Sequence, residues 1–208
     1  MDILSHGLWA GAAAKALRQA QGKESKRKLN VWLTAFWGVF PDLFAFTIPF
    51  VWLFGNLLSG NVNFSDIHPP TGDEPERKLL FGNGDTRQAE SSISYLTASL
   101  YNISHSMVVF FVVIALVIIF RKFFLKKNRI PWEMGGWFLH IALDVPTHSY
   151  AFYPTPVFWP IAGWKFQGYA WANPLFIVVN YTALIIAYSA IRYFKKRTLP
   201  KNKLDATT

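Results

Sequence analysis

The chain has 208 residues, of which 52% are hydrophobic and 17% aromatic, and its formal net charge is +9. Its mean hydropathy of +0.21 is too high for an ordinary soluble domain, so the composition predicts a small polytopic membrane protein with a single domain, residues 1–208. Cysteine is absent, which excludes disulfides and thiolate metal sites. Any bound metal must therefore use histidine and carboxylate ligands, a set that suits zinc or another borderline divalent ion.

Lysine and arginine gather in three runs, at residues 23–28, 121–129 and 192–203, each beside an apolar segment. Membrane topology explains this placement better than a nucleic-acid interface, so we expect no nucleic-acid partner. The positive-inside rule predicts that these runs and the C-terminus are cytoplasmic and that the acidic residues 59–100 are extracytoplasmic. No cleavable signal peptide is expected, because no basic leader precedes the first apolar stretch.

The apolar segments predict an all-α, polytopic membrane helix bundle of about five helices, embedded in the lipid bilayer of an inner membrane. A polar loop, residues 59–100, separates the second and third helices, and an aromatic stretch, residues 149–171, precedes the last helix as an interfacial belt or a lid. The tail from residue 200 to residue 208 is expected to be disordered. The predicted membrane segments lie at about 3–20, 30–58, 103–125, 132–148 and 173–194.

The stretch 135–148, GGWFLHIALDVPTH, carries three ionisable side chains in an apolar setting. His140 and Asp144 are four residues apart and so share one face of a helix. His148 extends that face if the helix continues through Pro146, and lies on a turn if it does not. Ionisable groups within a membrane segment are costly and tend to mark functional sites. The alternative is a buried His–Asp pair with a structural role only.

Candidates in other segments reach the same depth. At a rise of about 1.5 Å per residue, the candidates in four segments lie roughly 14–25 Å above the cytoplasmic basic runs. They therefore form a predicted His/Asp cluster in the outer half of the membrane. His68 is left out because it lies in the polar loop beside two prolines. The candidate metal ligands are, in falling order, His140 and Asp144, His6 and His105, Asp42 and His148, and finally Asp2.

Such a cluster can hold one or two divalent ions, with zinc expected first and manganese as the alternative. A metal with an open position activates water for hydrolysis, and Asp144 and His148 are the candidate catalytic residues. Ser104, Ser106 and Thr147 are candidates to orient the imidazoles. A Ser-His-Asp triad is not expected, because the sequence has no nucleophile-elbow motif. Taken singly, Asp42 or Asp2 can instead cap a helix.

Four motifs together resemble the YdjM-like family of predicted membrane-bound, metal-dependent hydrolases. They are the opening MDILSHGLWAGAAA, the segment WGVFPDLF, the segment GWFLHIALDVPTH and the following FWPIAGWKF. That family is distantly similar to zinc-dependent phospholipase C, an all-helical metal enzyme. The resemblance implies phosphoester hydrolysis, with a small or lipid-like substrate. It also implies metal-binding roles for His6, Asp42, His105, His140 and Asp144.

The chain departs from the family pattern at three positions. Phe44 stands where many members have a second aspartate, and Leu100 and Tyr101 stand where many have a histidine and an arginine. Two hypotheses follow: a hydrolase of lipid or lipid-linked phosphoesters, or a non-enzymatic membrane protein such as a metal carrier, a transporter or an inactive scaffold. Few ionisable groups lie in the cytoplasmic half of the segments, which counts against a transporter. The sequence sets no oligomeric state.

Overall fold

The structure is a computed structural model that describes residues 1–21, 28–61, 87–126, 130–150 and 153–197. These residues contain helices and no strand, which confirms the predicted all-α class. The helices are α1 (Ile3–Ala20), α2 (Val31–Leu58), α3 (Arg87–Ser104), α4 (Met107–Phe123), α5 (Gly135–Thr147) and α6 (Pro174–Arg197), with a short 3-10 helix, η4 (Trp132–Met134), before α5.

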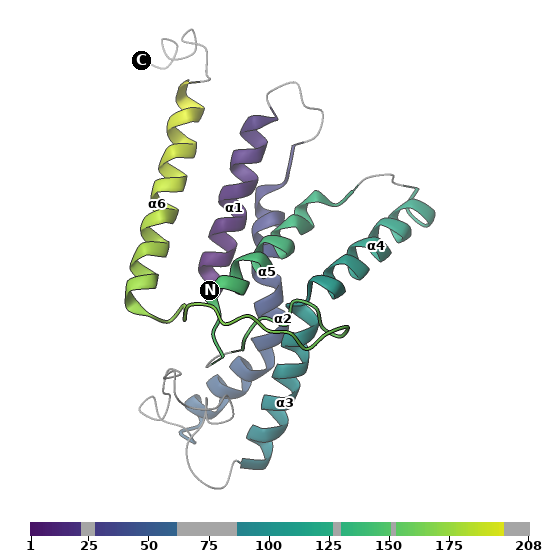
Figure 1. The fold of residues 1–208 in the computed structure, drawn as a ribbon, viewed down its shortest axis with the longest axis vertical. Coiled ribbons are helices and arrows are strands. Elements are labelled where there is room, and N and C mark those ends of the chain that lie inside the picture. The colour runs from purple at the N-terminus through teal and green to yellow at the C-terminus, as the bar shows by residue number, and fades with distance from the viewer. Residues whose placement is uncertain (22–27, 62–86, 127–129, 151–152, 198–208) are drawn as a thin grey trace.

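The long helix α2 runs through the middle of the molecule and packs against α1, α3 and α5 (Figure 1). The contacts depend on small residues. A Cβ atom on Gly38 would lie 2.5 Å from the Cβ of Ala10 in α1, and one on Gly136 of α5 would lie 2.1 Å from the carbonyl oxygen of Thr34. Neither position has room for a side chain, so the three backbones approach one another closely, as is common in membrane helix packing.

Two helices are long and apolar enough to cross a membrane, Val31–Leu58 and residues 174–195 of α6. Residues 93–104 and 107–123 form a third candidate, which is bent by 62° at the break between them. Among the described helices, α1 and α5 do not qualify. Helix α5 has 13 residues and is about 20 Å long, against a hydrocarbon core of about 30 Å. Of the five membrane segments that the sequence predicts, two or three are therefore candidates to cross the membrane fully.

The region between α2 and α4 differs from the sequence-based expectation in two ways. Residues 87–100, which were placed in the polar loop, form the first part of α3, and the segment 103–125 is not one continuous helix. Helix α3 ends at Ser104, and a new helix starts after Ser106, whose side chain accepts a hydrogen bond from Val109 N at 3.3 Å. Serines favour helix caps over helix interiors, which explains why the helix breaks at this point.

The C-terminal ends of α1, α4 and α6 lie on one side of the molecule, opposite the end of α2 and the start of α3 (Figure 1). These helix ends carry basic residues, among them Arg18, Arg121, Lys122 and Arg192. The outer faces of α4 and α6 expose apolar side chains such as Phe111, Leu116, Val178 and Ile185. This combination is typical of helices in contact with lipid whose basic ends share one membrane face. Which face that is stays a prediction.

The α2–α5 contact can be tested at Gly136. In the variant Gly136→Ala the new methyl group must push α5 away from the Thr34 carbonyl, so we expect a destabilisation of about 1–3 kcal/mol and a lower Tm in detergent. Gly135→Ala is the matched control, because a Cβ on Gly135 meets nothing within 4 Å. Equal thermal unfolding curves for the two variants would contradict the close approach.

Candidate metal centre

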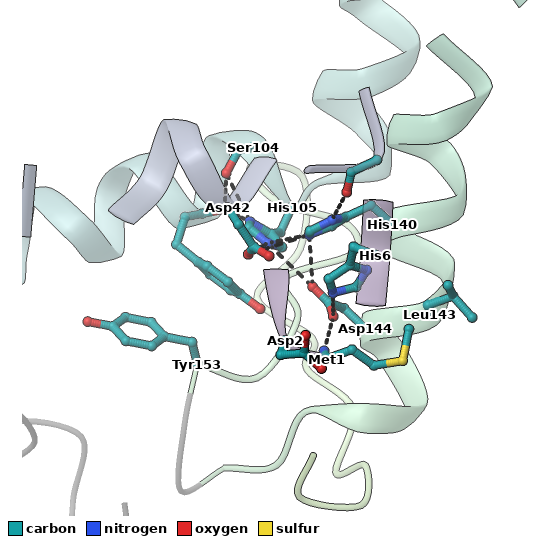
Figure 2. A network of polar contacts seen from close by, with 12 residues as sticks. Met1, Asp2, His6, Asp42, Ser104, His105, His140, Leu143, Asp144 and Tyr153 are labelled. Carbon is teal, nitrogen blue, oxygen red and sulfur yellow. Dashed lines mark hydrogen bonds and ion pairs between the residues drawn. The ribbon is translucent and has the colours of Figure 1, made fainter. Parts of the chain in front are cut away.

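Three helices and the break between α3 and α4 bring buried imidazoles and carboxylates together (Figure 2). Helix α1 provides His6, α2 provides Asp42, the break provides His105, and α5 provides His140 and Asp144. His148 follows α5 directly. All six residues are at most 4% exposed. Side chains that are far apart in the sequence therefore meet at one buried point.

Helix α5 brings His140 and Asp144 together on one face. The Nε2 atom of His140 lies 3.1 Å from Oδ2 of Asp144, as the spacing of four predicts. The helix continues through Pro146 to Thr147, and His148 is the extended residue at its end, with its backbone N–H donating to the Asp144 carbonyl at 2.9 Å. This settles the alternative that the sequence left open: His148 leaves the helix, yet its Nε2 lies 3.2 Å from Oδ1 of Asp144.

The inner group consists of Asp42, His105, His140 and Asp144, each with one possible ligand atom within 4.8 Å of the others. The two Nε2 atoms of His105 and His140 are 3.0 Å apart. His105 Nε2 lies 3.4 Å from Asp42 Oδ1 and 3.4 Å from Asp144 Oδ2, and His140 Nε2 lies 3.6 Å from Asp42 Oδ1. This group can hold a metal ion.

Main-chain carbonyl groups determine which imidazole nitrogen carries the proton. The Nδ1 atom of His140 lies 2.7 Å from the Gly38 carbonyl oxygen, and that of His105 lies 3.2 Å from the Tyr101 carbonyl oxygen. A carbonyl oxygen can only accept, so Nδ1 is the protonated nitrogen and Nε2 presents its lone pair to the inside. In the neutral imidazoles two lone pairs and two carboxylates then face one another, an arrangement that a cation between them would stabilise.

The distances are close to those around a bound metal. Tetrahedral zinc holds nitrogen and oxygen ligands at about 2.0–2.2 Å, which separates neighbouring ligand atoms by about 3.3–3.6 Å. Three of the five measured separations within the inner group are 3.4–3.6 Å, and the other two, 3.0 and 3.1 Å, are slightly shorter. Asp144 Oδ2, which faces both imidazoles, and Asp42 Oδ2 are buried and have no hydrogen-bond partner among the described residues. The residues present therefore fit a divalent ion.

His6 lies beside this inner group. Its ring stacks on that of His140 with the centroids 3.7 Å apart, and its Nε2 lies 2.9 Å from Asp144 Oδ1. Its buried Nδ1 has no hydrogen-bond partner in the part of the chain that the structure describes. The amino nitrogen of Met1 donates to the same oxygen of Asp144 at 2.6 Å (Figure 2). Oδ1 of Asp144 is thus the centre of a second set of polar contacts.

Asp2 has another use in this structure. Its Oδ1 accepts hydrogen bonds from Ser5 N and from the Tyr181 hydroxyl, both at 2.9 Å, so the carboxylate caps α1. Burial acts to raise the pKa of the Asp2 carboxyl, but the hydrogen bonds from Ser5 and Tyr181 hold it below its ordinary value. Asp2 is not part of the four-residue group, and the capping role that the sequence allowed accounts for its contacts.

The side chains around the cluster agree in part with the sequence analysis. Ser104 Oγ lies 2.9 Å from His105 Nδ1, as expected of an orienting residue. The side chain of Ser106 instead caps α4 and donates to the Trp159 carbonyl oxygen, and Thr147 donates to the Leu143 carbonyl oxygen at 2.8 Å. Ser104 thus contacts an imidazole as predicted, whereas the hydrogen bonds that Ser106 and Thr147 donate go to main-chain carbonyl groups.

Sequence reasoning missed the role of Tyr101, which it treated only as a departure from the family pattern. Its ring stacks on His105 with the centroids 3.7 Å apart, and its hydroxyl lies 3.1 Å from His148 Nδ1. The position of Tyr101, four residues before His105, was the available signal. Phe44 is 41% exposed and packs against Phe40, so its side chain does not replace the family's second aspartate.

The variant His140→Ala should abolish tight metal binding, because it removes one ligand atom and leaves two carboxylates facing each other. Elemental analysis of purified protein would measure this. His68→Ala removes a histidine outside the described residues and is expected to keep the metal content of the wild type. A wild-type protein that remains folded without metal would contradict the metal centre.

Comparison with protein families matches residues 1–200 to the family described as YdjM inner membrane protein. Comparison with curated proteins and with solved structures gives no match. The matched region contains all the helices described above and every residue of the buried cluster. The resemblance drawn from the sequence motifs is therefore confirmed, and the chain belongs to the YdjM inner membrane protein family.

Proposed function

We propose that this protein is a membrane-bound, metal-dependent hydrolase that cleaves a phosphoester in a lipid or lipid-linked substrate. One observation carries the proposal. Two imidazole lone pairs and two carboxylates converge in a fully buried position, at the spacing that a divalent ion requires of its ligands. A buried group of acceptors without a cation is unfavourable, so metal binding is the simplest purpose of this arrangement.

The residues have distinct roles in this proposal. Asp42, His105, His140 and Asp144 hold the ion, which supplies Lewis acidity and lowers the pKa of a coordinated water. His148 lies beside these ligands, with its Nδ1 3.0 Å from the Tyr153 carbonyl oxygen and its Nε2 3.2 Å from Oδ1 of Asp144. A proton taken up by Nε2 would be stabilised by the Asp144 carboxylate. Asp144 and His148 are therefore the proposed catalytic pair.

A lipid-like substrate is supported by the segment 153–172, which we call the aromatic strap. Backbone hydrogen bonds hold the strap across the site: Met107 N donates to Val157 O at 3.0 Å, and Gly168 N donates to His148 O at 2.7 Å. Figure 1 shows the strap running from the junction of α2, α3 and α4 to the start of α6. The strap exposes apolar side chains, with Ile161 80% and Trp164 50% exposed. Aromatic residues in such a position suit the membrane–water interface, where a lipid substrate arrives.

A second candidate function is a closed structural metal site in a non-enzymatic membrane protein. The burial of the cluster favours it, because four protein ligands fill a tetrahedral zinc and leave no place for substrate. A metal with higher coordination, such as manganese, keeps places open with the same ligands. A hydrolase should therefore be active with a metal that keeps places open, whereas a structural site should give no activity with any metal.

Hydrolysis can be tested with a short-chain fluorescent phospholipid in mixed micelles, with zinc or manganese added. Asp144→Asn should lower the rate by about 10²-fold or more, because the carboxylate touches both the ion-binding group and His148. Glu133→Gln is the matched control, since Glu133 precedes α5 and contacts Asn30 N at 3.5 Å. Metal-loaded protein without activity on any phosphoester would favour the structural role.

The proposed orientation places the basic helix ends in the cytoplasm and the acidic segment 59–100 outside. Because the chain has no cysteine, single cysteines can be introduced as labels in Ser65→Cys and Lys23→Cys. An impermeant maleimide should label the first in right-side-out vesicles and the second in inside-out vesicles. The reverse pattern would put the cluster in the inner half of the membrane.

A further inference from the structure

The two oxygens of Asp144 face different histidines. Oδ2 lies 3.1 Å from His140 Nε2 and 3.4 Å from His105 Nε2, within the inner group. Oδ1 lies 2.9 Å from His6 Nε2 and 3.2 Å from His148 Nε2, outside that group. One carboxylate therefore separates two pairs of imidazoles, and each pair has its own oxygen.

The outer pair has the same chemistry as the inner pair. His148 Nδ1 faces the Tyr153 carbonyl oxygen, which can only accept, so the lone pair of Nε2 points towards Asp144. The His6 ring is held by stacking on His140, and neither of its nitrogens makes a hydrogen bond within the described residues. A buried imidazole without such a partner is unfavourable unless a cation accepts its lone pair.

A positive charge already lies against this oxygen. The Met1 amino group donates to Oδ1 of Asp144 at 2.6 Å and to Thr147 Oγ1 at 3.2 Å. The contact shows that the outer side of the carboxylate accommodates a cation at a site that is otherwise fully buried. Thr147 adds a neutral oxygen at the same place.

We propose that Asp144 bridges two divalent cations, the first held by Asp42, His105 and His140 and the second by His6 and His148. The inference rests on the proposed function and deepens it. His6 and His148 both place Nε2 within 3.2 Å of Oδ1 of Asp144 and so build the second position. With this cation bound, the Nε2 lone pair of His148 is used as a ligand, and this role replaces the proton-accepting role that His148 has beside a single ion.

Charge balance connects the second cation to the substrate. Two divalent ions bring more positive charge than Asp42 and Asp144 neutralise, and the four imidazoles are neutral as ligands. The excess positive charge in a buried site favours an anionic substrate such as a phosphoester, and two-metal sites bind both the attacking and the leaving oxygen. A single ion with both carboxylates would leave only the charge of the Met1 amino group.

The test counts the ions and asks whether they are coupled. Protein with a C-terminal tag is stripped with a chelator, loaded with Mn²⁺ and measured by elemental analysis and electron paramagnetic resonance. We expect about two Mn²⁺ per chain and an exchange-coupled spectrum, since a carboxylate joins the ions. His148→Ala and His6→Ala should each bind about one Mn²⁺ and show the hyperfine sextet of an isolated ion. His68→Ala is the matched control and should keep the coupled pair.

The outcomes separate this inference from the proposed function. One Mn²⁺ per wild-type chain with an isolated-ion spectrum, or two uncoupled ions, overturns the bridge while leaving a metal-dependent hydrolase possible. No bound Mn²⁺ in folded protein overturns both. Circular dichroism checks the fold of each variant. If an alanine variant does not fold, His6→Gln and His148→Gln keep side-chain volume and must still reduce the count to about one.

Discussion

The arrangement of the site depends on hydrogen bonds that point away from it. Carbonyl groups of Gly38, Tyr101 and Tyr153 face the Nδ1 atoms of His140, His105 and His148. Each of these contacts leaves the lone pair of Nε2 facing the carboxylates. In water such an arrangement would be solvated, but here the residues are buried and the Nε2 atoms lie against the carboxylates of Asp42 and Asp144. The histidines are thus prepared for a cation before any cation binds.

The packing of the helices holds these carbonyl groups in place. Gly38 is both the acceptor for His140 and the residue whose missing side chain lets α1 approach α2. Gly136 allows α5 to contact α2 in the same way. The break between α3 and α4 begins at His105, whose backbone N–H still donates to the Tyr101 carbonyl at 2.9 Å, and the Ser106 cap fixes the new direction. The orientation of the imidazoles therefore depends on both the close helix packing and the break between α3 and α4.

The sequence predicted which residues form the cluster better than it predicted the carbonyl groups that orient the imidazoles. Helical spacing identified His140 and Asp144, and counting residues from the basic runs put His6, Asp42 and His105 at one depth, where the structure brings them together. The carbonyl contacts could not be predicted, because every residue has a carbonyl group and only the fold selects Gly38 or Tyr153. The start of α3 was missed because its serines and threonines hide the helical pattern. Asp2 has the correct spacing from His6 but caps its own helix.

X-ray absorption at the zinc edge of metal-loaded protein tests the central claim most directly, because it reports the ligands around the ion itself. We predict nitrogen and oxygen neighbours at about 2.0–2.2 Å with the outer-shell scattering of at least two imidazole rings. The same spectrum for His68→Ala and a loss of imidazole scattering for His105→Ala would agree with the proposed ligands. A zinc environment without imidazole, or with sulfur or water only, would contradict the account.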